Sequence, residues 1–196
     1  DSLASTRQAG REVVLVSSRD HVLPGEDADA AYVLEEVFSR RGLRVLSRSR
    51  AASVERTGDG VRVTLIDGTV VEGSHCLMAV GSVPNTETIG LAECGVRLDN
   101  GGYVEVDRVS RTSARGVYAA GDCTGVLMLA SVAAMQGRIA MWHALGDAVA
   151  PLDLKTVSST VFTEPEIATV GWSQAAVDAG ATAVIQPGGS VRDDEV

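Results

Sequence analysis

The chain has 196 residues, of which 45% are apolar, so it can bury one sizeable core or two small ones and is expected to be globular. Its 17 basic and 26 acidic residues give a formal net charge of −9 without a basic cluster, which argues against nucleic acid or an anionic membrane as a partner. No apolar stretch approaches the ~20 residues of a membrane span, and the start does not resemble a signal peptide.

The three cysteines, Cys76, Cys94 and Cys123, are 18 and 29 positions apart. These separations fit neither a paired-cysteine metal site nor a vicinal redox disulfide. We therefore expect reduced thiols, a cytoplasmic protein and no metal site. Because the first residue is aspartate, we also expect the chain to begin inside a longer protein or to have been processed.

Residues 11–50 carry the pattern strand, helix, strand. "EVVLVSSRD" and "LRVLSRS" are the two strand candidates, and apolar residues recur at helical spacing between them. We expect Asp27 to cap this helix and Gly42 to end it in a left-handed conformation. The order predicts a right-handed parallel crossover. The residues expected on the apolar face of the helix are Ala30, Val33, Leu34, Val37 and Phe38.

From Ala51 apolar and polar residues alternate, with turn signals at 58–60 and 67–68, which predicts a three-stranded antiparallel meander. The apolar run "HCLMAV" (75–80) then ends at Gly81 and predicts a parallel strand that returns to the first sheet. A polar, extended connection is expected to follow.

Residues 117–120 predict a short buried strand that ends in Gly121 and Asp122. We expect Ser131 to cap a helix that continues to about Leu145. The residues expected along one face of this helix are Val132, Met135, Ile139 and Trp142.

The last region of the sequence predicts smaller elements. Two short strands are expected on either side of Thr163-Glu164-Pro165, and a helix is expected over 174–179. A further strand is expected from residue 181.

Gly121 and Asp122 are the first candidate site residues. The carboxyl end of a parallel strand is where open α/β sheets hold ligands, and a carboxylate there can accept hydrogen bonds from ligand hydroxyls. Glycine removes the side chain that would block the ligand. The alternative is an acid that only caps a helix or serves the turn.

Leu129, Ala130 and Ser131 open the helix that follows. Their free N–H groups and the positive end of the helix dipole suit a group that becomes anionic, such as a reduced flavin ring. An ordinary capped helix is the alternative.

Ser17, Ser18 and Arg19 follow the first strand, where the adenosine ribose of a dinucleotide lies in a nucleotide-binding crossover. No Asp or Glu stands at the strand end to bind a pair of ribose hydroxyls. Two hydroxyls and a guanidinium suit a 2′-phosphate, which favours NADPH over NADH. A solvated turn arginine is the alternative.

Four stretches together resemble the pyridine nucleotide-disulfide oxidoreductase family. They are "VTLIDGTVVEGSHCLMAVGSVPNT" (63–86), "GVYAAGDCTG" (116–125), "ASVAAMQGRIA" (130–140) and "VSSTVFTEPEIATVGWSQ" (157–174). The resemblance extends to about Gly180, and it is strongest to the lipoamide-dehydrogenase-like NAD(P)H quinone reductases.

The resemblance implies an α/β fold, with partial doubly wound nucleotide-binding domains in three layers followed by the start of an α+β dimerisation domain. Residues 1–81 resemble the later part of the NAD(P) domain. Residues 82–152 resemble the C-terminal part of the FAD domain, and residues 153–196 resemble the start of the dimer-interface domain. A homodimer is accordingly implied for the full-length protein.

By the same resemblance, Asp122 matches the acid that binds the flavin's ribityl chain, and residues 129–131 match the segment that meets the isoalloxazine ring. Gly81 matches the glycine beside the bound nicotinamide nucleotide. Two departures are visible: Ser82 stands where arginine is usual, and Ala130-Ser131 replaces a common Thr-Pro.

The sequence also lacks motifs that the family carries. It has no G-x-G-x-x-G turn for either pyrophosphate, no cysteine pair separated by four residues and no C-terminal His…Glu pair. We therefore expect part of a flavoprotein that uses FAD and NAD(P)H, with hydride transfer to the flavin and electron delivery to a quinone. The alternatives are a fragment of a disulfide reductase such as lipoamide dehydrogenase, and a non-catalytic remnant.

Overall fold

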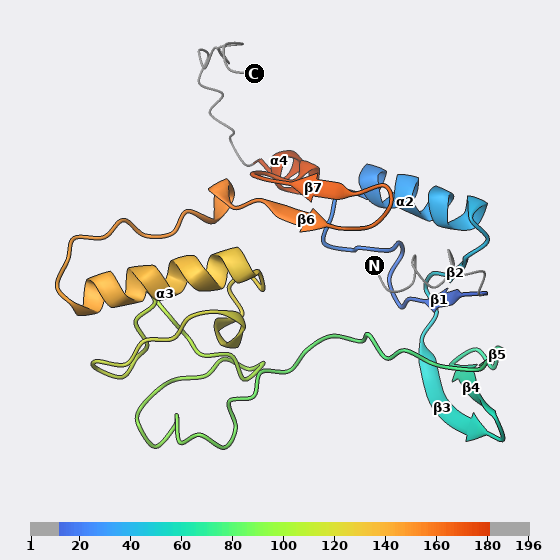
Figure 1. The fold of residues 1–196 in the computed structure, drawn as a ribbon, viewed down its shortest axis with the longest axis horizontal. Helices are drawn as coiled ribbons and strands as arrows, with labels where there is room; N and C mark the ends of the chain where they lie inside the picture. Colours follow the sequence, from blue (N-terminus) through green and yellow to red (C-terminus); the bar gives the residue numbers. More distant parts are fainter. Residues whose placement is uncertain (1–11, 181–196) are drawn as a thin grey trace, which may run out of the picture. The chain divides into compact units, whose positions relative to one another are not determined.

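The structure, a computed structural model, describes residues 12–180 (Figure 1). These residues divide into two compact units, one made of 12–76 with 160–180 and the other of 77–159. The limits 81 and 152 that the resemblance implies for the domains stay a prediction.

The first unit begins with the predicted crossover. Strand β1 (Val14–Val16) pairs in parallel with β2 (Arg44–Leu46), and helix α2 (Ala28–Arg40) connects them. Gly42 has a φ of +81°, so the left-handed helix end is as expected. Asp27 stands at the N-cap position, but its carboxylate does not cap the helix and instead accepts a hydrogen bond from the Gln174 N–H at 2.9 Å.

The core of the first unit lies between α2 and the two small sheets beside it. Leu34 and Phe38 pack there with residues of β1, β2 and β7, so distant segments share one core (Figure 1). Val33, expected on the apolar face, is 53% exposed, whereas Ala31 is fully buried. The buried residues of this core are Val13, Val22, Leu34, Phe38, Leu43 and Ile167.

The predicted meander is present as β3 (Ala51–Thr57), β4 (Gly60–Leu65) and β5 (Val70–Gly73), which pair antiparallel in that order. Two further short strands, β6 (Ser159–Val161) and β7 (Ile167–Thr169), also pair with each other. Helix α4 (Gln174–Asp178) follows. The strand expected from residue 181 lies outside the described residues.

The second unit is built around helix α3 (Ala130–Ala144), with two single 3₁₀ turns, η1 (Asp122–Thr124) and η2 (Leu154–Thr156). The predicted cap is wrong: the helix begins one residue before Ser131, and Leu129 takes the N-cap position without a side-chain bond. Trp142, expected on the apolar face, is 47% exposed. The buried residues of α3 are Val132, Gln136, Ile139 and Ala140.

Two predicted strands are wrong. Residues 75–80 belong to none of the strands in the described part of the chain, and Val80 is 86% exposed. Residues 117–120 are half-buried and make one antiparallel bridge, between Arg111 and Tyr118. A strand needs a neighbour to satisfy its N–H and C=O groups, and within residues 12–180 no strand pairs with either run.

The mixed α/β class, with a parallel pair and small antiparallel sheets, is confirmed. None of the helices within residues 12–180 combines the length and apolar character that a membrane span requires.

Gly60 gives a test of the meander. A Cβ built at Gly60 would lie 2.7 Å from the Gly73 carbonyl oxygen of the paired strand. We expect Gly60→Ala to lower the free energy of unfolding by about 1–3 kcal/mol, as overpacking does. At Gly25 a Cβ would meet open space, and we expect Gly25→Ala to change it by less than about 0.5 kcal/mol. Urea unfolding checks both, and equal midpoints for the two variants would contradict the packing.

Candidate functional site

The turn at Gly121 has a backbone that only glycine adopts easily. Gly121 is buried, with φ +87° and ψ −159°. A Cβ built there would also lie 3.3 Å from the Cβ of Ala133 in the first turn of α3. The conformation therefore strongly favours glycine, and a Cβ would also be in tight contact with the helix.

Two buried side chains hold this turn in place. The Gly121 N–H donates to Gln136 Oε1 at 2.8 Å, and Thr124 Oγ1 donates to the Gly121 carbonyl at 2.8 Å. Gln136 Nε2 in turn donates to Thr124 Oγ1 at 3.4 Å. Gln136 and Thr124 are only 5% and 7% exposed, so the three bonds lie away from competing water.

Sequence reasoning did not single out Gln136 or Thr124. The available signal was positional: Gln136 follows Val132 by one helical turn and so shares the buried face of α3. A polar residue on a buried face needs a partner, and here the partners are the two ends of the Gly121 turn.

Asp122 follows Gly121 directly and begins η1. Its side chain is exposed, and the residues that the structure describes give its carboxylate no hydrogen-bond partner. The main chain on its N-terminal side is held by Gln136 and Thr124. The carboxylate is therefore presented from a fixed point with its acceptor oxygens available.

The start of α3 supplies donors near this turn. By helix geometry the N–H groups of Ala130, Ser131 and Val132 have no acceptor within the helix, and the first such bond runs from Ala133 to Leu129 at 2.9 Å. Ser131 is exposed and no side chain caps the helix. Since a Cβ built at Gly121 would lie 3.3 Å from the Ala133 Cβ, the structure brings the turn and the helix start together.

The nucleotide candidates lie elsewhere. Ser17, Ser18 and Arg19 belong to the first unit, immediately after β1, where Ser17 N–H donates to the Leu46 carbonyl at 2.9 Å. Gly81 belongs to the second unit, has a φ of +118° and is exposed, with open space around a built Cβ. The Ser17–Arg19 group and Gly81 therefore belong to different units of the structure.

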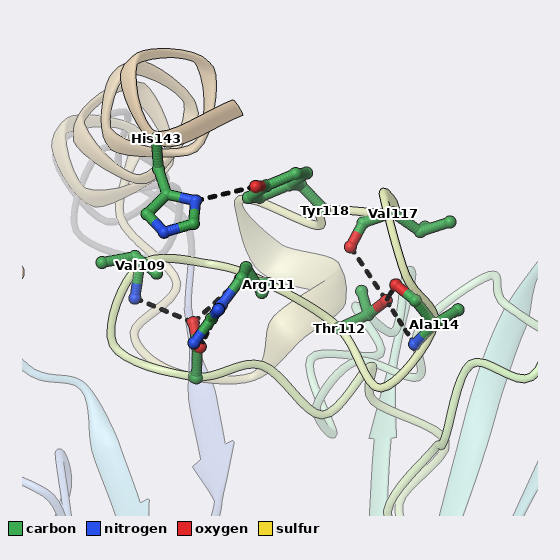
Figure 2. A network of polar contacts seen from close by, with 8 residues as sticks. Val109, Arg111, Thr112, Ala114, Val117, Tyr118 and His143 are labelled. Atoms are coloured by element: carbon green, nitrogen blue, oxygen red, sulfur yellow. Dashed lines mark hydrogen bonds and ion pairs between the residues drawn. The ribbon is translucent and has the colours of Figure 1, made fainter. Parts of the chain in front are cut away.

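An open hollow of about 850 Å³ lies in the second unit, bounded by residues between 97 and 126 and by His143. Figure 2 shows the polar contacts beside it. The Tyr118 hydroxyl lies 2.7 Å from His143 Nδ1, and the Thr112 hydroxyl donates to the Val117 carbonyl at 2.9 Å. These contacts hold the segment that leads into Gly121.

The most strongly held carboxylate in this network is Asp107. It accepts hydrogen bonds from the Val109 N–H at 2.9 Å, the Arg111 N–H at 3.0 Å and Arg111 Nε at 2.7 Å (Figure 2). Partial burial raises its pKa, but the bonds from Arg111 and Val109 and the charge of Arg111 together outweigh burial, so the pKa lies below its ordinary 3.8.

Comparison with protein families identifies the family of this chain. The model of the family described as "Pyridine nucleotide-disulphide oxidoreductase" matches residues 2–137. The chain belongs to this family. Pyridine nucleotide-disulphide oxidoreductases use FAD and NAD(P)H, and the resemblance noted in the sequence is confirmed.

Two curated members of the family show how far the likeness extends. The chain is 63% identical over 176 residues to an NAD(P)H dehydrogenase (quinone) of Mycobacterium tuberculosis, covering 90% of this chain and 36% of that protein. It is 37% identical over 167 residues to a dihydrolipoyl dehydrogenase of Chlamydia trachomatis, and this match covers 85% of this chain and 36% of that protein. The chain thus spans little more than a third of the length of these relatives.

Two solved structures share the fold of this chain. The crystal structure of LpdA from Mycobacterium tuberculosis superposes with a TM-score of 0.88 at 61% identity, over 93% of this chain and 40% of that chain. The flavoprotein disulfide reductase RclA from Escherichia coli superposes with a TM-score of 0.83 at 22% identity, over 93% of this chain and 42% of that chain. At this identity the likeness shows the fold alone.

Replacing Gln136 tests the bonds that hold the Gly121 turn. We expect Gln136→Met, which keeps the volume, to lower the free energy of unfolding by about 1–3 kcal/mol, because the buried Gly121 N–H loses its acceptor. Arg138→Gln, at an exposed site two residues along α3, is the control and is expected to change it by less than about 0.5 kcal/mol. Thermal unfolding measures both, and a Gln136→Met protein as stable as the control would contradict the assignment.

Asp107 gives a pH-dependent test. Because its folded-state pKa lies below the unfolded value of 3.8, its charge stabilises the fold above pH 3.8, and the contribution is lost as the pH falls through the folded-state pKa. We expect Asp107→Asn to cost about 1 kcal/mol at pH 7, a figure reduced for solvent exposure, and nearly nothing well below the folded-state pKa. Urea unfolding at a series of pH values measures this, with Asp147→Asn as control. A cost that is independent of pH would contradict it.

Proposed function

We propose that the complete protein carrying this chain is an FAD-dependent NAD(P)H oxidoreductase that passes a hydride from NAD(P)H to FAD and electrons on to a quinone-type acceptor. The choice of quinone is supported by the 63% identity to an NAD(P)H dehydrogenase (quinone), against 34–37% to the dihydrolipoyl dehydrogenases. The observation that carries the proposal is the fixed Gly121–Asp122 turn beside the open start of α3.

The residues of the second unit fit a flavin. The exposed Asp122 carboxylate is an acceptor for the hydroxyl groups of a ribityl chain, and the missing Cβ at Gly121 lets the turn lie close against α3. The N–H groups at residues 130–132 offer donors and a positive dipole end to the pyrimidine edge of the ring. Bound FAD would supply the hydride acceptance, while the protein residues position it and stabilise its charge.

The residues of the first unit fit the nucleotide half of NADPH. Ser17, Ser18 and Arg19 follow β1 with their main chain tied to the end of β2, and Arg19 is exposed. Two hydroxyls and a guanidinium are donors for a 2′-phosphate. We propose Gly81 as the close-approach glycine for the nicotinamide end and a homodimer for the complete protein, as the family resemblance implies. The spacing of the three cysteines supports the further proposal that this protein is cytoplasmic.

A second candidate is a disulfide reductase, which the similarity to dihydrolipoyl dehydrogenases favours. It requires a cysteine pair separated by four residues, and Cys76, Cys94 and Cys123 do not form one. The sequence of the complete protein distinguishes the two, because the pair is either present elsewhere in it or absent. A colourless purified 196-residue chain would favour a non-catalytic remnant for this chain alone.

The Asp122 carboxylate is the residue on which the flavin proposal rests. We expect Asp122→Asn in the complete protein to weaken FAD binding by about 10-fold to 100-fold, as expected for losing a charge-assisted hydrogen bond. Asp147→Asn, an exposed acid of the same unit, is expected to leave FAD binding unchanged. Titration of the apoprotein with FAD, followed by flavin fluorescence, measures both.

The same preparation tests the activity. We expect flavin-dependent oxidation of NADPH with a quinone acceptor. A complete protein that binds no FAD, or that binds FAD and oxidises no nicotinamide nucleotide with a quinone, would overturn the proposal.

A further inference from the structure

The turn that follows β1 contains one acid directly beside the residues proposed to hold a 2′-phosphate. Asp20 comes immediately after Ser17, Ser18 and Arg19 and is exposed. A carboxylate a few ångströms from a phosphate dianion repels it, and a free carboxylate at this place would instead accept hydrogen bonds from an unphosphorylated ribose. The charge state and pairing of Asp20 therefore bear on which nucleotide the turn accepts.

Arg48, from the turn that follows β2, pairs with this acid. Its Nε donates to Asp20 Oδ1 at 2.7 Å, and its backbone N–H donates to the Arg19 carbonyl at 2.9 Å. Arg48 has a φ of +52°, a left-handed conformation that is uncommon for a residue with a long side chain. One residue thus contacts both the side chain of Asp20 and the main chain of Arg19.

A neighbouring backbone hydrogen bond also joins the two turns. Ser49 N–H donates to the Ser17 carbonyl at 2.8 Å. The turns after β1 and β2 are therefore joined at Ser17 and at Arg19, and the Arg48 side chain lies over the acid that follows.

The pKa values of Asp20 and Arg48 are shifted in the directions expected for this pairing. The hydrogen bond from Arg48, followed by its charge, holds the pKa of Asp20 below its ordinary 3.8, with a smaller contribution from His21. The pKa of Arg48 is raised by the same partner. Asp20 is thus ionised at neutral pH, and its charge is matched by a guanidinium that the β2 turn supplies.

We propose that Arg48 is a positioning residue for nucleotide selectivity: by pairing with Asp20 it removes the repulsion that this acid would exert on a 2′-phosphate and leaves Ser17, Ser18 and Arg19 to bind it. The proposal rests on the proposed function of the first unit as a nucleotide site. Its consequence is that Arg48 acts through Asp20, so the two residues are coupled in their effect on ligand choice.

Isothermal titration of the complete protein with adenosine 2′,5′-bisphosphate and with 5′-AMP tests the coupling without any turnover. We expect Arg48→Ala to weaken binding of the bisphosphate by about 5-fold at low salt and to leave 5′-AMP within about 2-fold, because only the former carries the 2′-phosphate. In the double variant Arg48→Ala with Asp20→Asn, we expect bisphosphate affinity to return to within about 2-fold of the wild type. Arg44→Ala, an exposed arginine on β2, is the matched control and is expected to bind both ligands as the wild type does.

Two results would overturn the inference. In one, Arg48→Ala binds the bisphosphate as tightly as the wild type. In the other, it loses affinity that Asp20→Asn does not restore, which would mean that Arg48 does not act through the acid. If the proposed function itself is wrong, the wild-type protein binds neither ligand or oxidises no NADPH, and this result is distinct from the two above.

Discussion

The hydrogen bond from the Gly121 N–H to the Gln136 side chain is the interaction on which the candidate flavin site depends. It joins a turn that no other residue type adopts easily to the buried face of α3, and Thr124 closes the arrangement from the other side of the turn. An exposed carboxylate by itself is common on protein surfaces. Asp122 differs because the backbone that carries it is fixed beside the start of a helix whose N–H groups are available.

One segment of the second unit is both apolar and exposed. Leu77, Met78 and Val80 are 64%, 60% and 86% exposed in a run that reads as a buried strand. The chain spans 36% of the length of the curated relative from Mycobacterium tuberculosis, and within residues 12–180 this run belongs to none of the three sheets. We expect this run to be covered when it lies in a complete protein of the family, since contiguous exposed apolar residues are uncommon on the surface of a folded protein.

Much of the fold is predictable from the sequence where the determining contacts are local. The crossover from β1 through α2 to β2 and the meander β3–β5 follow from apolar spacing and from turn residues such as Gly42 and Gly58. The strands expected at 75–80 and 117–120 are wrong because pairing is a long-range property that an apolar run does not specify. Of the candidate site, Gly121 and Asp122 were found from a motif, whereas the roles of Gln136 and Arg48 depend on which segments meet in space. The assignment of Ser17–Arg19, Gly81, Asp122 and residues 129–131 to cofactors stays a prediction.

A crystal structure of the complete protein with FAD tests the central claim most directly. The account predicts an Asp122 carboxylate oxygen about 2.5–2.8 Å from a hydroxyl of the ribityl chain, with the Gly121 N–H still bonded to Gln136. A flavin bound elsewhere, or an Asp122 carboxylate directed away from it into solvent, would contradict the account.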